Sequence, residues 1–399
     1  MGIYIINENK LRIKEQNSLY PKDSHFIQVD IIKAIMIFLV IFDHTFPWDP
    51  LKNSMGVALW ERISIPVFLV IMGFNMGLSF DRKGETSLRK LYSWNYFKRK
   101  FWRYIFPFLL LYFLSTLIGL AINGFDPDAL KQYQHSWSFE HLFIGILPFY
   151  GPGNWFLPVI FWSILIMPLL YKGFSGKLRW RIITLFLCYV VELSIQLAVF
   201  FIFDPQNIST WPDYYDFLFY YRFIVTTPFF MLSAIGLGMW ISRNHEIFAK
   251  QNILLWILFP LSLFYLILYQ FFDFYFDFIV GDYNLFVFPY SAFLFLVGLQ
   301  LLPKKQDNKF IKGIAIIGKS TYHILLTQIL YFAIVINIWG DHYGASIIGI
   351  NLEYKLNVVF VYVVINWLIC IPIGVLWWYS ETKIRNYRLK NKNLDIKSI

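Results

Sequence analysis

The chain has 399 residues, of which 58% are hydrophobic and only 15% are charged, and its mean hydropathy is +0.53. This composition excludes an ordinary water-soluble globular protein, because a chain of this length could not cover so much apolar surface. The net charge of +10 does not indicate nucleic-acid binding, since the basic residues lie in short segments between apolar runs. We therefore predict an all-α, polytopic integral membrane protein.

Apolar runs of about 20 residues, the length that crosses a bilayer core, recur along the whole chain. The apolar segment 141–150 is too short to cross, so we expect it to be interfacial or re-entrant. The longer runs predict about ten transmembrane helices, near residues 28–47, 57–80, 102–123, 153–171, 181–203, 217–242, 252–272, 280–302, 313–339 and 357–380.

Basic segments alternate with acidic or neutral segments between these predicted helices. The connections 81–103, 172–181 and 303–312 and the C-terminal tail are rich in Lys and Arg. Because such segments stay on the cytoplasmic side, we expect both termini in the cytoplasm of a multi-pass cell-membrane protein. The predicted parts are a cytoplasmic segment 1–26, a transmembrane domain 27–380 and a basic cytoplasmic tail 381–399.

The first predicted helix carries an unusual set of polar residues. Lys33 and His44 are separated by three helical turns plus about 20°, so they share a face but lie roughly 16 Å apart along the axis. Asp30 is one turn from Lys33 and can pair with it, whereas Asp43 points about 100° away from His44. This face can line a polar cavity in which His44 is a general base. The alternative is a snorkelling Lys33 and a packing histidine.

Five motifs follow one another along the chain. They are "VDIIKAIMIFLVIFDH", "ISIPVFLVIMGFNMG", "FKRKFWRYIFP", "GPGNWFLPVIFW" and "IGKSTYHILLTQ". Together, over about residues 26–380, they resemble the membrane-bound acyltransferase-3 family. Met72 replaces a serine that is usual in the second motif, and Gln328 stands where many relatives have histidine.

The resemblance implies transfer of an acyl group, acetyl or succinyl, from cytoplasmic acyl-CoA to a hydroxyl of an extracytoplasmic glycan or its lipid-linked precursor. The catalytic residues that it implies are Asp30, Lys33 and His44. His44 would deprotonate the acceptor hydroxyl or, alternatively, carry the acyl group transiently. Acyl-CoA would be a co-substrate, and we expect no permanently bound cofactor and no metal. The expected partners are the lipid bilayer, the glycan acceptor and polysaccharide biosynthesis machinery, and no nucleic acid.

Donor binding is expected at the densest basic cluster of the chain, at the entrance of the third predicted helix. Lys100 and Arg103 match the family motif, one helical turn apart. Lys98 and Arg99 lie beside them, and their charge is equally explained by membrane topology alone.

Other polar residues in or near the predicted helices are weaker candidates for an acceptor site or cavity. Each has a structural alternative: a Glu192–Arg222 ion pair, interhelical hydrogen bonds, an interfacial aromatic anchor or simple solvation. The candidates are Trp155, Arg222, His323, Gln328, Glu192 and His141.

Two other functions compete with the acyltransferase hypothesis. A transporter or flippase for a glycan or its lipid-linked precursor would also need a polar face, but we find no paired repeats of the kind that transporters show. A degenerate family member could instead act as a partner of a polysaccharide synthase. The presence of both Lys33 and His44 argues against such a loss of activity.

Overall fold

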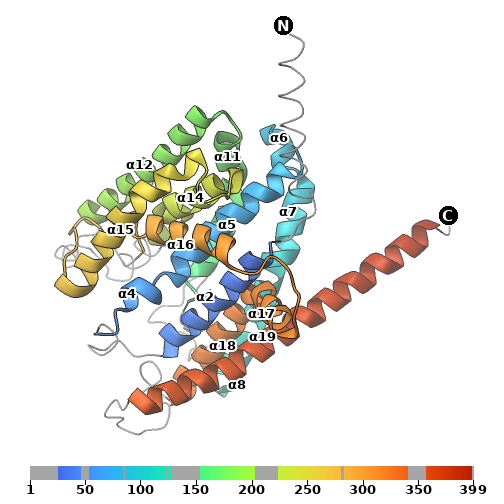
Figure 1. Cartoon of the computed structure of the whole chain (residues 1–399). Coiled ribbons are helices and arrows are strands. Elements are labelled where there is room, and N and C mark those ends of the chain that lie inside the picture. Colours follow the sequence, from blue (N-terminus) through green and yellow to red (C-terminus); the bar gives the residue numbers. More distant parts are fainter. Residues whose placement is uncertain are drawn as a thin grey trace.

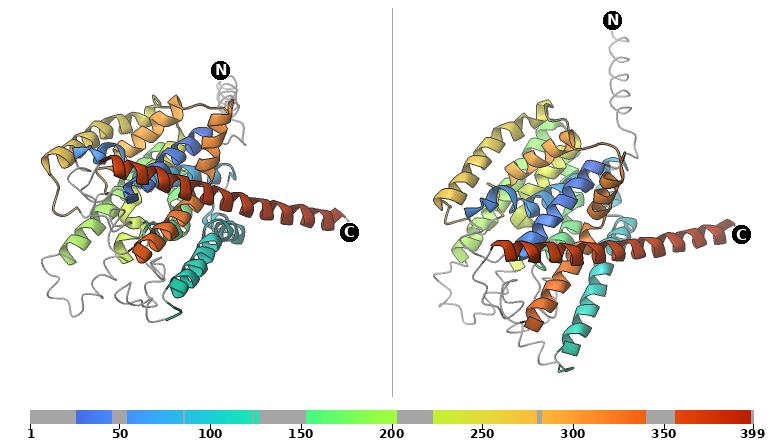
Figure 2. Two further views of the ribbon diagram at one scale, coloured as in Figure 1. Left: turned by 90° about the horizontal axis from the view of Figure 1, so that it is seen from below. Right: turned by 60° about the horizontal axis from the view of Figure 1, so that its bottom comes forward.

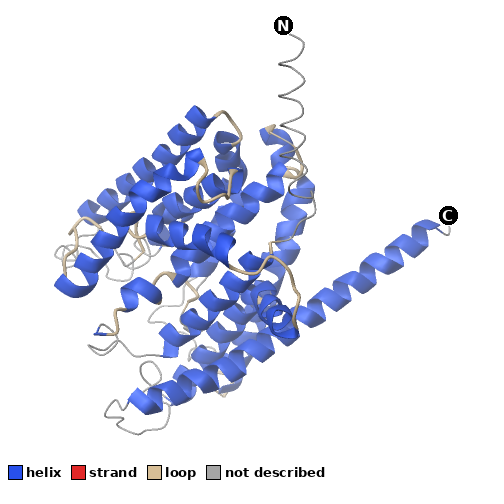
Figure 3. Cartoon of the chain, in the orientation of Figure 1, coloured by secondary structure: helices blue, strands red, loops and turns tan. Residues whose placement is uncertain are grey.

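The computed structural model describes residues 26–45, 54–84, 86–122, 124–126, 153–202, 223–279, 283–339 and 356–397 (Figure 1). The views in Figure 2 show one bundle of helices, with the long C-terminal helix projecting beyond it. Within the described ranges every regular element is a helix (Figure 3), so the predicted all-α class is confirmed.

Most helices follow the predicted apolar runs, but α14 (Leu232–Arg243) and α16 (Phe288–Leu301) begin only within the sixth and eighth runs. Two short 3₁₀ helices, η3 (Pro228–Met231) and η4 (Lys250–Asn252), and a π-helical turn, η1 (Phe101–Ile105), interrupt the α-helical pattern. The α-helices are α2 (Ile27–Thr45), α4 (Val57–Trp60), α5 (Ser64–Asp81), α6 (Leu88–Leu91), α7 (Trp94–Lys100), α8 (Phe106–Ile122), α11 (Phe156–Phe174), α12 (Leu178–Ile202), α14 (Leu232–Arg243), α15 (Ile253–Phe272), α16 (Phe288–Leu301), α17 (Lys309–Lys319), α18 (Thr321–Trp339) and α19 (Leu356–Lys397).

Six helical segments of the described chain are long and apolar enough to cross a membrane. The remaining predicted spans correspond to α2, α14, α16 and the pair α17–α18. The protein is therefore an all-helical membrane protein, while the count of ten and the side of each terminus stay predictions. The six segments are Val57–Asp81, Leu88–Ile122, Phe156–Phe174, Leu178–Ile202, Lys250–Phe272 and Phe360–Tyr387.

The ninth predicted span is two helices rather than one. α17 ends at Lys319 and α18 begins at Thr321, with Ser320 between them. The hydroxyl of Ser320 donates to the carbonyl oxygens of Ile316 and Ile317, which gives the last turn of α17 a local partner. The predicted continuous span was therefore wrong at this residue.

A very close helix contact joins α5 and α14. A Cβ atom at Gly73 would lie 2.1 Å from the carbonyl oxygen of Ile235, and a Cβ at Gly238 would lie 1.9 Å from that of Val70. Only glycine allows two backbones to approach this closely. α14 is buried along almost its whole length, so this contact is at the centre of the bundle.

We expect Gly238→Ala to lower the free energy of unfolding by about 3 kcal/mol, because the added methyl group must push α14 away from α5. The matched control is Gly313→Ala in α17, where a Cβ would meet no atom of the described chain within 4 Å and alanine should stabilise the helix by about 1 kcal/mol. Thermal unfolding in detergent measures both. Equal melting temperatures for the two variants would contradict the close contact.

α2 lies in the middle of the elements that form the site. It contacts α5, α16, α17, α18 and α19. A Cβ at Gly318 of α17 would lie 1.8 Å from the carbonyl oxygen of Asp30, so α17 packs directly on the first turns of α2. At the other end of α2, the Asn366 amide of α19 donates to the Thr45 hydroxyl at 2.8 Å. α2 is thereby held at both ends.

Candidate functional site

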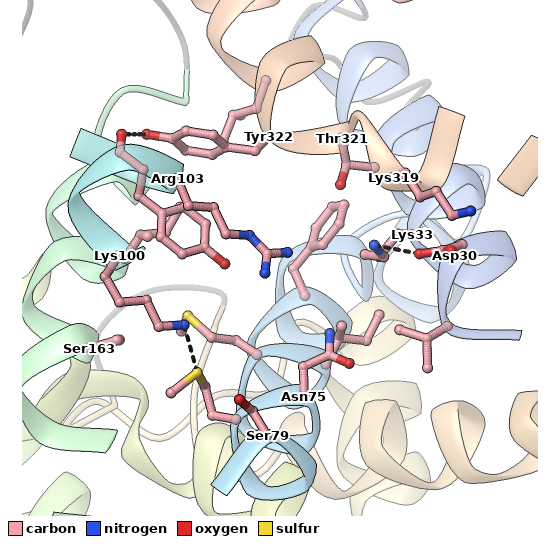
Figure 4. Close-up of a pocket in the computed structure, with 18 of the residues that line it drawn as sticks. Asp30, Lys33, Asn75, Ser79, Lys100, Arg103, Ser163, Lys319, Thr321 and Tyr322 are labelled. Atoms are coloured by element: carbon pink, nitrogen blue, oxygen red, sulfur yellow. Dashed lines mark hydrogen bonds and ion pairs between the residues drawn. The ribbon is translucent and has the colours of Figure 1, made fainter. Parts of the chain in front are cut away.

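A cavity of about 530 Å³ lies against α2, α5, α7, η1, α11, α18 and α19 (Figure 4). α2 contributes Lys33, Ile37 and Val40, which follow one another at spacings of four and three residues on one helix face. The cavity therefore follows the face that the sequence singled out.

Six cations from different elements line the cavity. They are Lys33, Arg82, Lys100, Arg103, Lys319 and Arg385. The two carboxylates that also line it are each paired locally: Asp30 with Lys33 at 2.7 Å, and Glu381 with the His323 imidazole at 2.8 Å. The cavity wall therefore has an excess of positive charge, which suits a ligand that carries phosphate groups.

Only part of the basic motif at the third predicted span faces the cavity. Lys100 and Arg103 line the cavity, whereas Lys98 and Arg99 do not. The Lys100 Nζ atom lies 2.8 Å from the Met76 sulfur, and Figure 4 shows the Arg103 guanidinium directed into the cavity toward Lys33. The π-helical turn η1 begins directly after Lys100 and carries Arg103, and such turns are frequent at functional sites.

His44 lies just beyond the apolar end of the cavity. A Cβ atom at Gly153 would be 3.7 Å from the side chain of Leu325, which lines the cavity, and 3.0 Å from the His44 imidazole. The same position would be 3.1 Å from the Gln328 amide nitrogen. Gly153, whose φ is +88°, therefore lies against both His44 and Gln328.

The side chain of Gln328 holds one nitrogen of the His44 ring. The Nδ1 atom of His44 is 3.2 Å from the Oε1 atom and 3.0 Å from the Nε2 atom of the Gln328 amide. When Nδ1 carries the ring proton and donates a hydrogen bond to Oε1, the other ring nitrogen, Nε2, carries the lone pair and can act as a base. Phe332 places its ring edge-on to His44, with the ring centres 6.0 Å apart.

Two of the weaker candidates lie close to this assembly. His323 lines the cavity, and the ring of Trp377 on α19 lies edge-on to it beside the Glu381 pair. Trp155 stacks on Tyr283, with ring centres 5.8 Å apart, two residues after Gly153. Arg222 and His141 lie outside the described residues.

Glu192 lies elsewhere, fully buried between α12 and α14. Its Oε2 atom accepts hydrogen bonds from the Ser233 amide at 2.8 Å and from the Ser233 hydroxyl at 2.7 Å. The carboxylate therefore joins two helices, and it is not part of the cavity wall.

Several cavity residues escaped the sequence analysis. Asn75 and Ser79 in the second predicted span and Arg82 just after it recur at helical spacing, and this polar stripe was a readable signal. Glu381 and Arg385 belong to the segment that was expected to be a basic tail, and α19 continues through both residues. In the part of the chain that the structure describes, no group of three or more His, Cys, Asp or Glu residues could hold a metal ion.

Comparison with known proteins agrees with the motifs. The model of the acyltransferase-3 family, which is described as an acyltransferase domain, matches residues 26–379. Comparisons with curated proteins and with solved structures found no match.

Proposed function

This chain belongs to the acyltransferase-3 family, and we propose that it transfers an acetyl or succinyl group from cytoplasmic acyl-CoA to a hydroxyl of an extracytoplasmic glycan or its lipid-linked precursor. The observation that carries the proposal is one cavity with an excess of cations in its wall and His44 beyond its apolar end. The enzyme would act in the cell membrane with both termini in the cytoplasm.

The cavity offers different surroundings to the two ends of an acyl-CoA. The phosphates would lie among the cations, of which Lys100 and Arg103 come from the family motif. The thioester would extend along apolar walls such as Ile37 and Val40 of α2 and Phe156 of α11 toward His44. Lys33 would remain charged beside Asp30 and help to neutralise the negative charge of the donor phosphates.

The proposed chemical step uses the His44 imidazole as the base. The Nε2 atom of His44 takes the proton of the acceptor hydroxyl, and the oxygen attacks the thioester carbonyl. The carbon–sulfur bond then breaks, and the CoA thiolate leaves with the proton that the imidazolium returns. Gln328 would hold Nδ1 and so keep Nε2 available. The competing route, an acyl-histidine intermediate, uses the same residue as nucleophile.

Acceptor binding would take place on the His44 side of the cavity. The Trp155 and Tyr283 rings, stacked near Gly153, present aromatic faces of the kind on which sugar rings pack. Arg222 and His141 remain proposed acceptor residues, with polysaccharide biosynthesis machinery as a proposed source of acceptor. Glu192 is better explained as a helix-joining group, because Ser233 supplies its hydrogen bonds.

The test uses right-side-out membrane vesicles that contain labelled acetyl-CoA or succinyl-CoA, prepared from cells with and without the protein. We expect alkali-labile label on the external glycan only when the protein is present, and the labelled donor that works identifies the acyl group. A flippase or transporter would move glycan across the membrane without consuming thioester. Glycan movement without labelling would therefore favour that alternative.

A further inference from the structure

One face of α5 follows the cavity over about four helical turns. The lining residues on this face are Phe68, Met72, Asn75, Ser79 and Arg82. Their spacings of four, three, four and three residues place them in one stripe, which is about 21 Å long at 1.5 Å per residue. Along the chain, the side chains of this stripe are first apolar, then an amide and a hydroxyl, and finally a cation.

The two uncharged polar residues of this stripe are open to the cavity. Asn75 and Ser79 are exposed, whereas their neighbours Phe74 and Phe80 are buried in the bundle. Figure 4 shows both side chains at the cavity wall. Neither makes a hydrogen bond to another residue in the described part of the chain. A polar side chain in the middle of a membrane helix is costly unless water or a ligand satisfies it.

The order of groups along α5 matches the order of groups along an acyl-CoA. That molecule carries phosphates at one end, then a hydroxyl and two amides in its pantetheine arm, and then the thioester. We propose that Asn75, assisted by Ser79, binds the amide groups of the pantetheine arm, an inference that rests on the proposed function. The Asn75 side chain has both a donor and an acceptor, as an amide partner requires.

The facing helix supports the same alignment. α2 and α5 contact each other, and the α2 face runs from the cation Lys33 through the apolar Ile37 and Val40 toward His44. α2 therefore offers no hydrogen-bonding side chain between Lys33 and His44 on this face. Polar contacts to the middle of the donor must come from other walls, and α5 supplies the Asn75 amide and the Ser79 hydroxyl to the same cavity.

The experiment measures inhibition constants against labelled CoA in membranes, using CoA, pantetheine and adenosine 3′,5′-bisphosphate as competitors. Asn75→Leu is expected to weaken the binding of CoA and of pantetheine by the same factor, about 3- to 10-fold. The affinity for the bisphosphate should not change. Arg103→Gln is the complementary variant. It should weaken the binding of CoA and of the bisphosphate by about 10- to 100-fold and leave the affinity for pantetheine unchanged.

The outcomes separate this inference from the proposed function. Failure of the wild-type protein to bind CoA would remove the proposed function itself. Normal CoA and pantetheine binding by Asn75→Leu, with wild-type binding intact, would overturn only the role of Asn75. If Asn75→Leu binds none of the three ligands, the smaller change Ser79→Ala is the deciding variant. Selectively weaker binding of CoA and pantetheine by Ser79→Ala would support the assignment. Wild-type affinity for both ligands would overturn it.

Discussion

Replacement of His44 by alanine is expected to lower acyl transfer by about 10²- to 10⁴-fold, the usual contribution of a general base. CoA affinity should remain close to that of the wild type, because five of the six cavity cations lie on other elements and Lys33 lies three helical turns from His44. The measurement is the ester-linked acyl content of surface polysaccharide from cells that make either protein, together with release of CoA in their membranes.

The controls for this comparison are equal amounts of both proteins in the membrane and equal CoA affinity. A selective loss of transfer then assigns the chemistry to His44, and the mass of the added group identifies the donor. Equal transfer by both proteins would place the base elsewhere and would strengthen the transporter alternative.

Replacement of Gly153 by alanine should reduce transfer by about 10²-fold, although Gly153 has no side chain to take part in the reaction. The new Cβ atom would lie 3.0 Å from the His44 ring and 3.1 Å from the Gln328 amide, so both groups must shift. A displacement of this kind disturbs the alignment of base and hydroxyl more than it disturbs folding. The initial transfer rate at saturating acyl-CoA measures the effect.

The matched control is Gly124→Ala. Gly124 also has a positive φ, +65°, but a Cβ there would meet no atom of the described residues within 4 Å. Both variants therefore carry the strain of alanine in the left-handed region, and only Gly153→Ala adds a contact with the His44–Gln328 pair. Similar transfer rates for the two variants would show that the neighbourhood of Gly153 does not govern the reaction.

Much of the α2 face was predictable because it depends on a single helix. The spacing of Asp30, Lys33 and His44 fixes their relative directions once the segment is helical, and the Asp30–Lys33 pair has the expected geometry. The positions of the helices followed from apolar runs for the same local reason. The stripe of Asn75, Ser79 and Arg82 was equally local, but it was overlooked in a strongly apolar segment.

Contacts between distant segments could not be predicted in this way. The helix α19 continues beyond residue 380, where a basic tail was expected, and the His323–Glu381 pair ties it to α18. The Glu192 carboxylate accepts a hydrogen bond from Ser233, 41 residues away, while its proposed partner Arg222 lies outside the described residues. Neither contact has a periodic signature, because each depends on how two helices dock.

The sequence by itself determined that this protein is an all-helical membrane protein, that it belongs to the acyltransferase-3 family, and that Lys33 and His44 share one helix face. These properties follow from composition, motif order and helical periodicity, which act within short segments. The tertiary structure decided that Gln328, 284 residues from His44, holds its imidazole, and that six cations converge on one cavity. Such contacts arise from helix packing, in which glycines such as Gly318 allow the close approach of particular backbones.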